Sequence, residues 1–206
     1  MMSKFENFIY MNDEALSENE CNKIIDCVNT NKKTLQECQK YISVDLQEEV
    51  HEKNPLFKIN VRDDLQLFLS YTIFDFEIMN KITSICQEGM KEYSKKYPTI
   101  INTLPNGVCN PDIKYHIVKS GEGYHSWHSE WNTQLPNDRR MLVWHISLTN
   151  HENEGELEFL YHKERITPKA GRLIIFPAFF PWLHRGNAIR SDKEKHYITG
   201  WYYMNK

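Results

Sequence analysis

Residues 121–130, which read GEGYHSWHSE, decide how the rest of the sequence is interpreted. The two glycines mark a turn, and the residues after them are expected to enter a strand. Side chains alternate between the two faces of a strand, so His128 and Glu130 should point the same way. Side by side, an imidazole nitrogen and a carboxylate oxygen can bind one metal ion. A lone His-x-Glu tripeptide is a weak signal, however, and the alternative is a surface pair.

A third metal ligand has to come from a distant strand, and the sequence offers His184 and His145. His184 belongs to FPAFFPWLHRGN, residues 176–187, where apolar and aromatic neighbours would keep its ring dry. Its alternative role is to cap a strand end, whereas His145, inside an apolar strand, could be a hydrogen-bonded core residue. His151 and His162 stand among charges and are expected to be solvated. Two imidazoles and one carboxylate are the ligand pattern of non-haem Fe(II) oxygenases, because they leave coordination positions open.

A cation on the last expected strand could hold a dicarboxylate co-substrate. In KHYITGWYY, residues 195–203, alternation places Lys195, Tyr197, Thr199 and Trp201 on one face. An ammonium group buried among such side chains needs an anion. A carboxylate of 2-oxoglutarate would supply that anion.

Other side chains could share or replace the role of Lys195. Tyr115, on the strand before the glycine turn, is expected to offer a hydroxyl to the same carboxylate. The competing cations are Lys193, Arg190 and Arg185. Lys193 ranks second because it shares the alternation of Lys195 but lies in the polar SDKE turn.

The N-terminal half is interpreted as largely helical. A helix is expected near residues 17–30, where SENE has the form of a capping box and apolar residues follow at helical spacing. A second helix is expected over 76–97, because the pattern continues up to a proline. Residues 33–74 are interpreted as a variable, partly strand-like connector.

The C-terminal half is interpreted as many short strands, which predicts a β sandwich or a barrel-like roll. Apolar and aromatic runs alternate with turn signals, and the expected strands are 113–118, 141–148, 156–161, 172–176 and 196–204. We therefore expect one α+β domain over 1–206. Within it, residues 1–110 form helical support and connector, and residues 111–206 form the metal-binding roll.

Composition excludes several classes of protein. Of the 206 residues, 40% are hydrophobic and 26% are charged, which argues against a disordered or collagen-like chain. The net charge of −3 gives no reason to expect a nucleic-acid partner. No apolar run approaches the roughly 20 residues of a membrane span, and the N-terminus lacks the apolar core of a secretory signal. Five dispersed cysteines without a C-x-x-C pair indicate reduced thiols, so a cytoplasmic location is expected.

Taken together and in order, these segments resemble the prolyl-4-hydroxylase-like branch of the 2-oxoglutarate/Fe(II)-dependent dioxygenases. The resemblance covers most of the C-terminal half, whereas the N-terminal helices resemble the family's helical support only loosely. The matching parts are Tyr115, the run that ends at Glu130, GELEFLY at 155–161, ITPKAGRLIIFP at 166–177, HRGN at 184–187, and residues 195–201.

The resemblance implies a double-stranded β-helix, or jelly roll, with supporting N-terminal helices. It implies that His128, Glu130 and His184 bind Fe(II), and that 2-oxoglutarate chelates this metal. The far carboxylate of 2-oxoglutarate would lie on Lys195 and Tyr115. The implied reaction is hydroxylation of a C–H bond with O2, releasing succinate and CO2, with ascorbate in support. A prolyl residue of a protein is the first candidate substrate; other peptidyl residues, free amino acids and small metabolites are alternatives.

Two features depart from the usual pattern of that family. The acidic ligand is usually Asp, and here it is Glu130, whose longer side chain would reach the metal with a different geometry. Lys195 follows His184 by eleven positions, near the usual offset, and one extra residue in the SDKE turn would explain the difference.

Other classes of protein would use similar residues. A cupin-like metal protein, either an isomerase or a binding module, also has a β roll, and His125, His128 and Glu130 could imitate part of its ligand set. The cupin His-x-His pattern is absent, however, and a cupin gives Lys195 no role. An inactive relative is disfavoured because the ligand types are intact. A zinc hydrolase is possible in principle but would also leave Lys195 unexplained.

Overall fold

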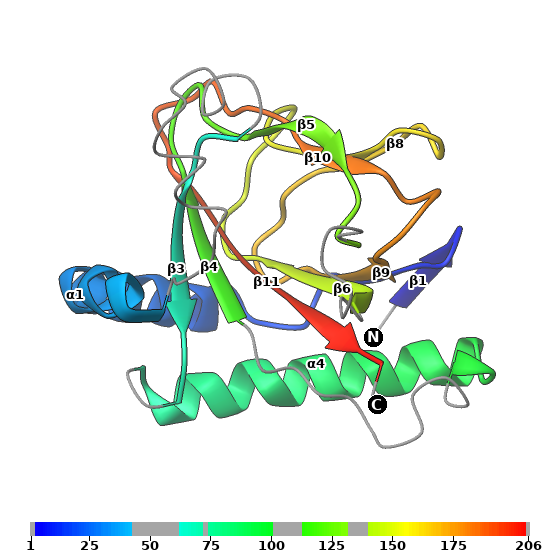
Figure 1. The fold of residues 1–206 in the computed structure, drawn as a ribbon, viewed down its shortest axis with the longest axis horizontal. Coiled ribbons are helices and arrows are strands. Elements are labelled where there is room, and N and C mark those ends of the chain that lie inside the picture. The colour runs from blue at the N-terminus through cyan, green and yellow to red at the C-terminus, as the bar shows by residue number, and fades with distance from the viewer. Residues whose placement is uncertain (1–2, 43–61, 72–73, 101–112, 132–139, 205–206) are drawn as a thin grey trace.

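The computed structural model describes residues 3–42, 62–71, 74–100, 113–131 and 140–204 (Figure 1). The helices in these ranges are α1 (Glu18–Ile42) and α4 (Phe76–Lys96). The strands are β1 (Ser3–Glu6), β2 (Ile9–Asn12), β3 (Leu65–Leu69), β4 (Ile113–Val118), β5 (Tyr124–His128), β6 (Arg140–Ser147), β7 (Leu157–Phe159), β8 (Glu164–Ile166), β9 (Leu173–Pro177), β10 (His184–Gly186) and β11 (Lys195–Tyr203). Neither helix is long and apolar enough to cross a membrane.

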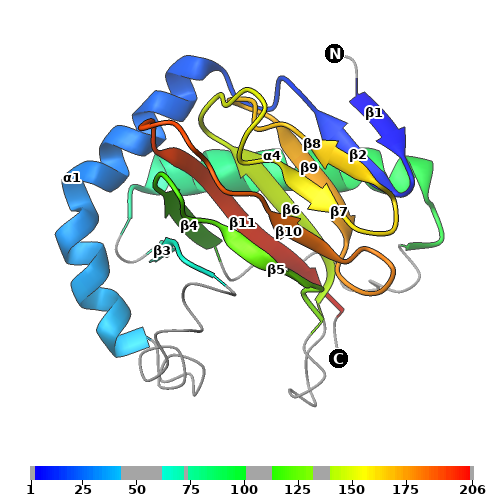
Figure 2. The same cartoon turned by 90° about the horizontal axis from the view of Figure 1, so that it is seen from above.

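The strands form two sheets that face each other as the layers of a jelly roll (Figures 1 and 2). The large sheet has the antiparallel order β1-β2-β9-β6-β11-β4-β3, and the small sheet has the order β5-β10-β7-β8. Both helices lie outside the roll, on the large-sheet side: α4 runs beneath that sheet in Figure 1, and α1 contacts β3. The predicted jelly roll with supporting helices is confirmed.

Both predicted helices are present, and the first is longer than predicted. The Ser17–Glu20 capping box is formed: the Ser17 amide donates to Glu20 Oε2 at 2.8 Å, and the Glu20 amide donates to Ser17 Oγ at 3.3 Å. The helix continues through the polar run after Val28 because Leu35, two turns further along, is buried against the same core. Part of the expected connector is therefore helix.

The N-terminal half supplies strands as well as helices. β1 and β2 form a hairpin at one edge of the large sheet, where β2 pairs with β9. β3 pairs with β4 at the other edge and is the strand-like part of the expected connector. The hairpin was not predicted, because two strands of four residues are too short to show a clear alternation. Residues 43–61, also assigned to the connector, lie outside the described part of the chain.

The two faces of the large sheet have different roles. The face toward the helices carries the main apolar core, in which Tyr115, Trp144, Ile198 and Tyr202 pack with residues of α1 and α4. The opposite face looks into the roll, where β4 and β11 present polar and aromatic side chains to a cavity. Since neighbours along a strand point to opposite faces, one residue of register decides whether a side chain reaches the core or the cavity.

Candidate metal and co-substrate site

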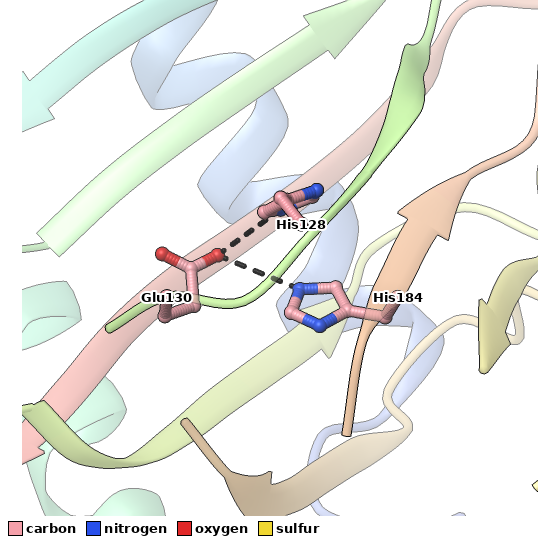
Figure 3. A group of neighbouring side chains, drawn as sticks. All are labelled: His128, Glu130 and His184. Carbon is pink, nitrogen blue, oxygen red and sulfur yellow. Dashed lines mark ion pairs between the residues drawn. The ribbon is translucent and has the colours of Figure 1, made fainter. Parts of the chain in front are cut away.

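The small sheet brings the three expected metal ligands together (Figure 3). β5 and β10 are antiparallel with His184 opposite His128, and Glu130 follows two residues after the end of β5. Glu130 Oε1 is 3.5 Å from His128 Nε2 and 3.5 Å from His184 Nε2. One ligand atom from each residue lies within 4.8 Å of the others. Three donors this close together can coordinate a single ion.

Both histidines are held in the tautomer that a metal requires. His128 Nδ1 is 3.0 Å from the Ser126 carbonyl oxygen, and His184 Nδ1 is 3.0 Å from the Trp182 carbonyl oxygen. A carbonyl oxygen only accepts hydrogen bonds, so each Nδ1 carries the proton and donates it. The nitrogen left to bind a metal is therefore Nε2 in each ring, the atom that faces Glu130.

The carboxylate of Glu130 is oriented from its other side. Trp201 Nε1 donates to Glu130 Oε2 at 3.0 Å, which leaves Oε1 directed at the two histidines. Arg140 Nη1 donates to the Glu130 backbone oxygen at 3.0 Å, and its guanidinium group lies 4.3 Å from the centre of the Trp201 ring. The longer acidic side chain thus has a defined partner for each oxygen.

The protonation states also suit metal binding. Burial disfavours the carboxylate of Glu130, but its interactions with the adjacent His128 and His184 outweigh burial, so the pKa of Glu130 lies well below its ordinary value. Burial lowers the pKa of His128, and the nearby His184 lowers it further. At neutral pH the site therefore presents an anionic carboxylate beside the neutral imidazole of His128, the forms that a divalent cation binds.

A cavity of about 400 Å³ connects these ligands to Lys195. Lys195 is 5% exposed; its Nζ donates to the Gly155 carbonyl oxygen at 2.6 Å and lies 4.9 Å from the centre of the Tyr197 ring. Burial lowers the pKa of this amine to about 8. The face that alternation predicted is the face observed, since the β11 residues lining the cavity are Lys195, Tyr197, Thr199 and Trp201.

Tyr115 does not lie where it was expected. It is fully buried in the core between the large sheet and the helices, and its hydroxyl is 2.8 Å from His196 Nδ1. Its β4 neighbours Lys114 and His116 line the cavity instead. The expectation that the Tyr115 hydroxyl reaches a carboxylate beside Lys195 is therefore wrong, because strand alternation turns this side chain to the opposite face.

The competing cations lie away from the cavity lining. Lys193 is exposed and donates to the Asn150 carbonyl oxygen at 3.2 Å. Arg190 donates to the Asn153 carbonyl oxygen, and Arg185 is paired with Glu158 at 2.8 Å. Of the cations considered at the sequence level, Lys195 alone lines the cavity that contains the three ligands.

Sequence reasoning missed part of the cavity wall. Arg62 Nε donates to Asp64 Oδ1 at 2.6 Å, and Asp64 Oδ2 is 2.8 Å from His116 Nδ1. His116 Nε2 is in turn 2.9 Å from Thr199 Oγ1 on β11. Alternation along β4 could have placed His116 on the cavity side. Arg62 and Asp64 stand in the stretch interpreted as a connector, where no local pattern signals a site.

The segment that contains the three ligands and Lys195 is similar to a known protein family. Residues 113–203 match the model of the 2OG-Fe(II) oxygenase superfamily. The matched segment begins with β4, ends with β11 and contains His128, Glu130, His184 and Lys195. Among curated proteins, none matches the chain.

Solved structures of other proteins show the same fold as this chain. The viral collagen prolyl hydroxylase of Paramecium Bursaria Chlorella virus-1, in its 2OG complex, has a TM-score of 0.68 at 20% identity, covering 97% of each chain. A Pseudomonas putida prolyl-4-hydroxylase has a TM-score of 0.60 at 16% identity, covering 96% of this chain and 93% of its own. A Trichoplax adhaerens prolyl hydroxylase is in complex with a peptide fragment of the hypoxia inducible factor oxygen degradation domain. It has a TM-score of 0.65 at 14% identity, covering 96% of this chain and 84% of its own.

Proposed function

We propose that this chain is a 2-oxoglutarate- and Fe(II)-dependent dioxygenase that hydroxylates a C–H bond of a peptidyl residue, with a prolyl residue as the first candidate. When bound, Fe(II) and 2-oxoglutarate would supply the oxidising chemistry: one oxygen atom of O2 enters succinate as CO2 leaves, and the other enters the substrate as a hydroxyl group. The contribution of the chain is to bind, orient and enclose these groups.

The observation that carries the proposal is the convergence of His128, Glu130 and His184, whose ligand atoms lie within 4.8 Å of one another. Two neutral nitrogen donors and one anionic oxygen donor fit Fe(II), and three protein ligands leave room for a chelating co-substrate. The partners Ser126 and Trp182 hold the two rings, and Trp201 holds the carboxylate. Such outer hydrogen bonds reduce the cost of ordering the ligands when the metal binds.

Lys195 is the residue proposed to bind the far carboxylate of 2-oxoglutarate. Its amine is buried at the cavity, and the Gly155 carbonyl oxygen fixes its direction. A buried ammonium group is stabilised by an anion, and a charge-assisted hydrogen bond to a carboxylate is stronger than a neutral one. The cupin-like alternative gives this buried amine no anionic partner.

A polypeptide substrate is the second part of the proposal. The Trichoplax adhaerens prolyl hydroxylase, which has this fold, is in complex with a peptide fragment. The cavity also has aromatic residues at its border: the partly buried Trp131 is part of its lining, and the exposed Phe179 packs edge-on against Trp131. An aromatic border suits the apolar ring of a prolyl residue.

The test is anaerobic reconstitution followed by turnover. Protein mixed with Fe(II) and 2-oxoglutarate should develop a visible absorption band that requires both, and succinate should form once O2, ascorbate and a proline-containing peptide are added. Glu130→Ala, which removes the anionic donor, should abolish both signals, whereas Glu122→Ala, at a partly exposed residue outside the cavity lining, should change neither. A band without succinate from any peptide would contradict the peptide substrate alone. Absence of the band in metal-loaded wild-type protein would contradict the function.

A further inference from the structure

His145 is a buried polar residue that neither the metal ligands nor the Lys195 pairing explains. It lies on β6, is 7% exposed and belongs to the cavity lining. Its Nδ1 is shut off from solvent and has no hydrogen-bond partner among the described residues. Buried polar atoms in native structures are nearly always paired, so this ring at a ligand cavity calls for an explanation.

Neighbouring rings fix the orientation of His145. Its imidazole stacks on the Tyr197 ring, with centroids 4.8 Å apart and planes 16° apart. Tyr197 also stacks on His116, at 4.3 Å and 3°. His116 and His145 stand on the two strands that flank β11, so the three rings form one stack across the cavity wall. A ring held in this way is ordered before any ligand binds.

His145 lines the cavity that contains both ends of the proposed co-substrate site, and its ring and the Lys195 amine both contact the Tyr197 ring. Burial lowers the pKa of His145 well below the ordinary value, and the positive charge of the nearby Lys195 lowers it further. The ring is therefore neutral and offers one donor and one acceptor. His184 belongs to the metal end of the cavity and Lys195 is the proposed carboxylate anchor, and His145 shares this cavity with both.

We propose that His145 binds the dicarboxylate co-substrate, its imidazole N–H donating a hydrogen bond to a carboxylate oxygen between the metal ligands and Lys195. This inference rests on the proposed function and adds a residue to its co-substrate site. The ligand class is a 2-oxo dicarboxylate. The ring takes over the neutral hydrogen bond that sequence reasoning had assigned to Tyr115, whose hydroxyl is engaged with His196 on the other face.

The experiment measures 2-oxoglutarate binding by calorimetry on Mn(II)-loaded protein, so that it does not depend on turnover. His145→Leu should weaken 2-oxoglutarate binding about tenfold, or about 1.4 kcal/mol, with Mn(II) affinity unchanged. His145→Gln, which keeps a donor, should lose less. Because leucine removes a buried unpaired nitrogen, His145→Leu should also raise the Tm of the ligand-free protein by about 2–4 °C. If His145 had only a structural role, its replacement would not both raise the Tm and weaken 2-oxoglutarate binding.

The matched control is His196→Leu, on the opposite face of the same sheet. His196 is also buried, but it bonds Tyr115 and does not line the cavity, so its replacement should lower the Tm and leave 2-oxoglutarate affinity unchanged. Unchanged 2-oxoglutarate affinity in folded His145→Leu overturns the inference, and so does loss of Mn(II) affinity, which would place the ring at the metal. Wild-type protein that binds Mn(II) but no 2-oxoglutarate overturns the proposed function itself, a result distinct from either.

Discussion

The two faces of β4 and β11 differ in chemistry although they belong to the same strands. On the helix side, Tyr115, Ile198 and Tyr202 are fully buried and pack in the main core. On the cavity side, His116, Lys195 and other polar groups meet across a space of about 400 Å³. Burial of apolar surface stabilises the fold on one face, whereas the other face keeps polar groups that line a cavity and can bind a ligand. Stability and ligand binding should therefore respond to different substitutions on the same strands.

The largest expected effect is on the cavity side, at the metal ligands. His184→Ala removes one of three donors and should weaken metal binding by more than about 100-fold, since loss of an outer-shell partner alone costs 10–100-fold. Calorimetric titration with Mn(II) measures this effect. His162→Ala, which alters a histidine outside the cavity lining, should bind Mn(II) as wild type does. Equal Mn(II) affinity in His184→Ala would remove this residue from the ligand set.

The next effect concerns the helix side. Trp144 is fully buried in the main core on β6, one residue before His145. Trp144→Ala should lower the free energy of unfolding by about 3–5 kcal/mol, because it leaves a large cavity. Urea denaturation measures the loss, and Mn(II) titration of the folded variant at low temperature should give wild-type affinity. A large fall in metal affinity without loss of stability would contradict the separation of the two faces.

The buried amine of Lys195 predicts that both 2-oxoglutarate affinity and the free energy of unfolding depend on pH. Burial lowers the pKa of its amine from 10.5 to about 8, so as pH rises the folded protein loses this proton before the unfolded chain does. The ammonium ion that the carboxylate requires is present below pH 8, and 2-oxoglutarate affinity should fall above it. The stability of the ligand-free protein should change in the opposite direction. Between pH 8 and 10.5 the unfolded chain holds more protons at Lys195 than the folded protein does, so the contribution of Lys195 to the free energy of unfolding rises with pH.

Two variants isolate the contribution of this amine. Lys195→Met should weaken 2-oxoglutarate binding about tenfold or more at pH 7 and remove the decline above pH 8. The exposed Lys193→Met is the matched control and should keep both the affinity and its pH profile. A wild-type affinity that stays constant from pH 7 to 9.5 would argue against an ammonium–carboxylate contact at this position.

The smallest expected effect tests the correction at Tyr115. Tyr115→Phe removes the hydroxyl that bonds His196 Nδ1 and should lower the free energy of unfolding by about 0.5–1.5 kcal/mol. The KM for 2-oxoglutarate should not change, because this side chain does not line the cavity. A raised KM with unchanged stability would return Tyr115 to the co-substrate site and erase the distinction between the faces.

Local sequence signals were sufficient to predict several helices and strands and one cavity-facing side chain. The capping box at Ser17 marked the start of α1, and the apolar runs marked β4, β6, β9 and β11 within a few residues. Alternation along β11 put Lys195 on the cavity face, as observed. The β1–β2 hairpin and the far end of α1 escaped, because four-residue strands and a polar helical stretch show their pattern only against the core they pack on.

By itself, the sequence determined the short-range features: the candidate ligands His128 and Glu130, the alternation of β11, and the jelly-roll class implied by its motifs. Only the tertiary structure decided which distant side chains meet. Antiparallel pairing of β5 with β10 set His184 opposite His128. The register of β4 turned Tyr115 toward the helices, and the stack on Tyr197 left Nδ1 of His145 without a partner in the described chain. The reason is physical: periodicity fixes how a side chain faces relative to its neighbours in sequence, whereas strand pairing and layer packing choose which face becomes core and which becomes cavity.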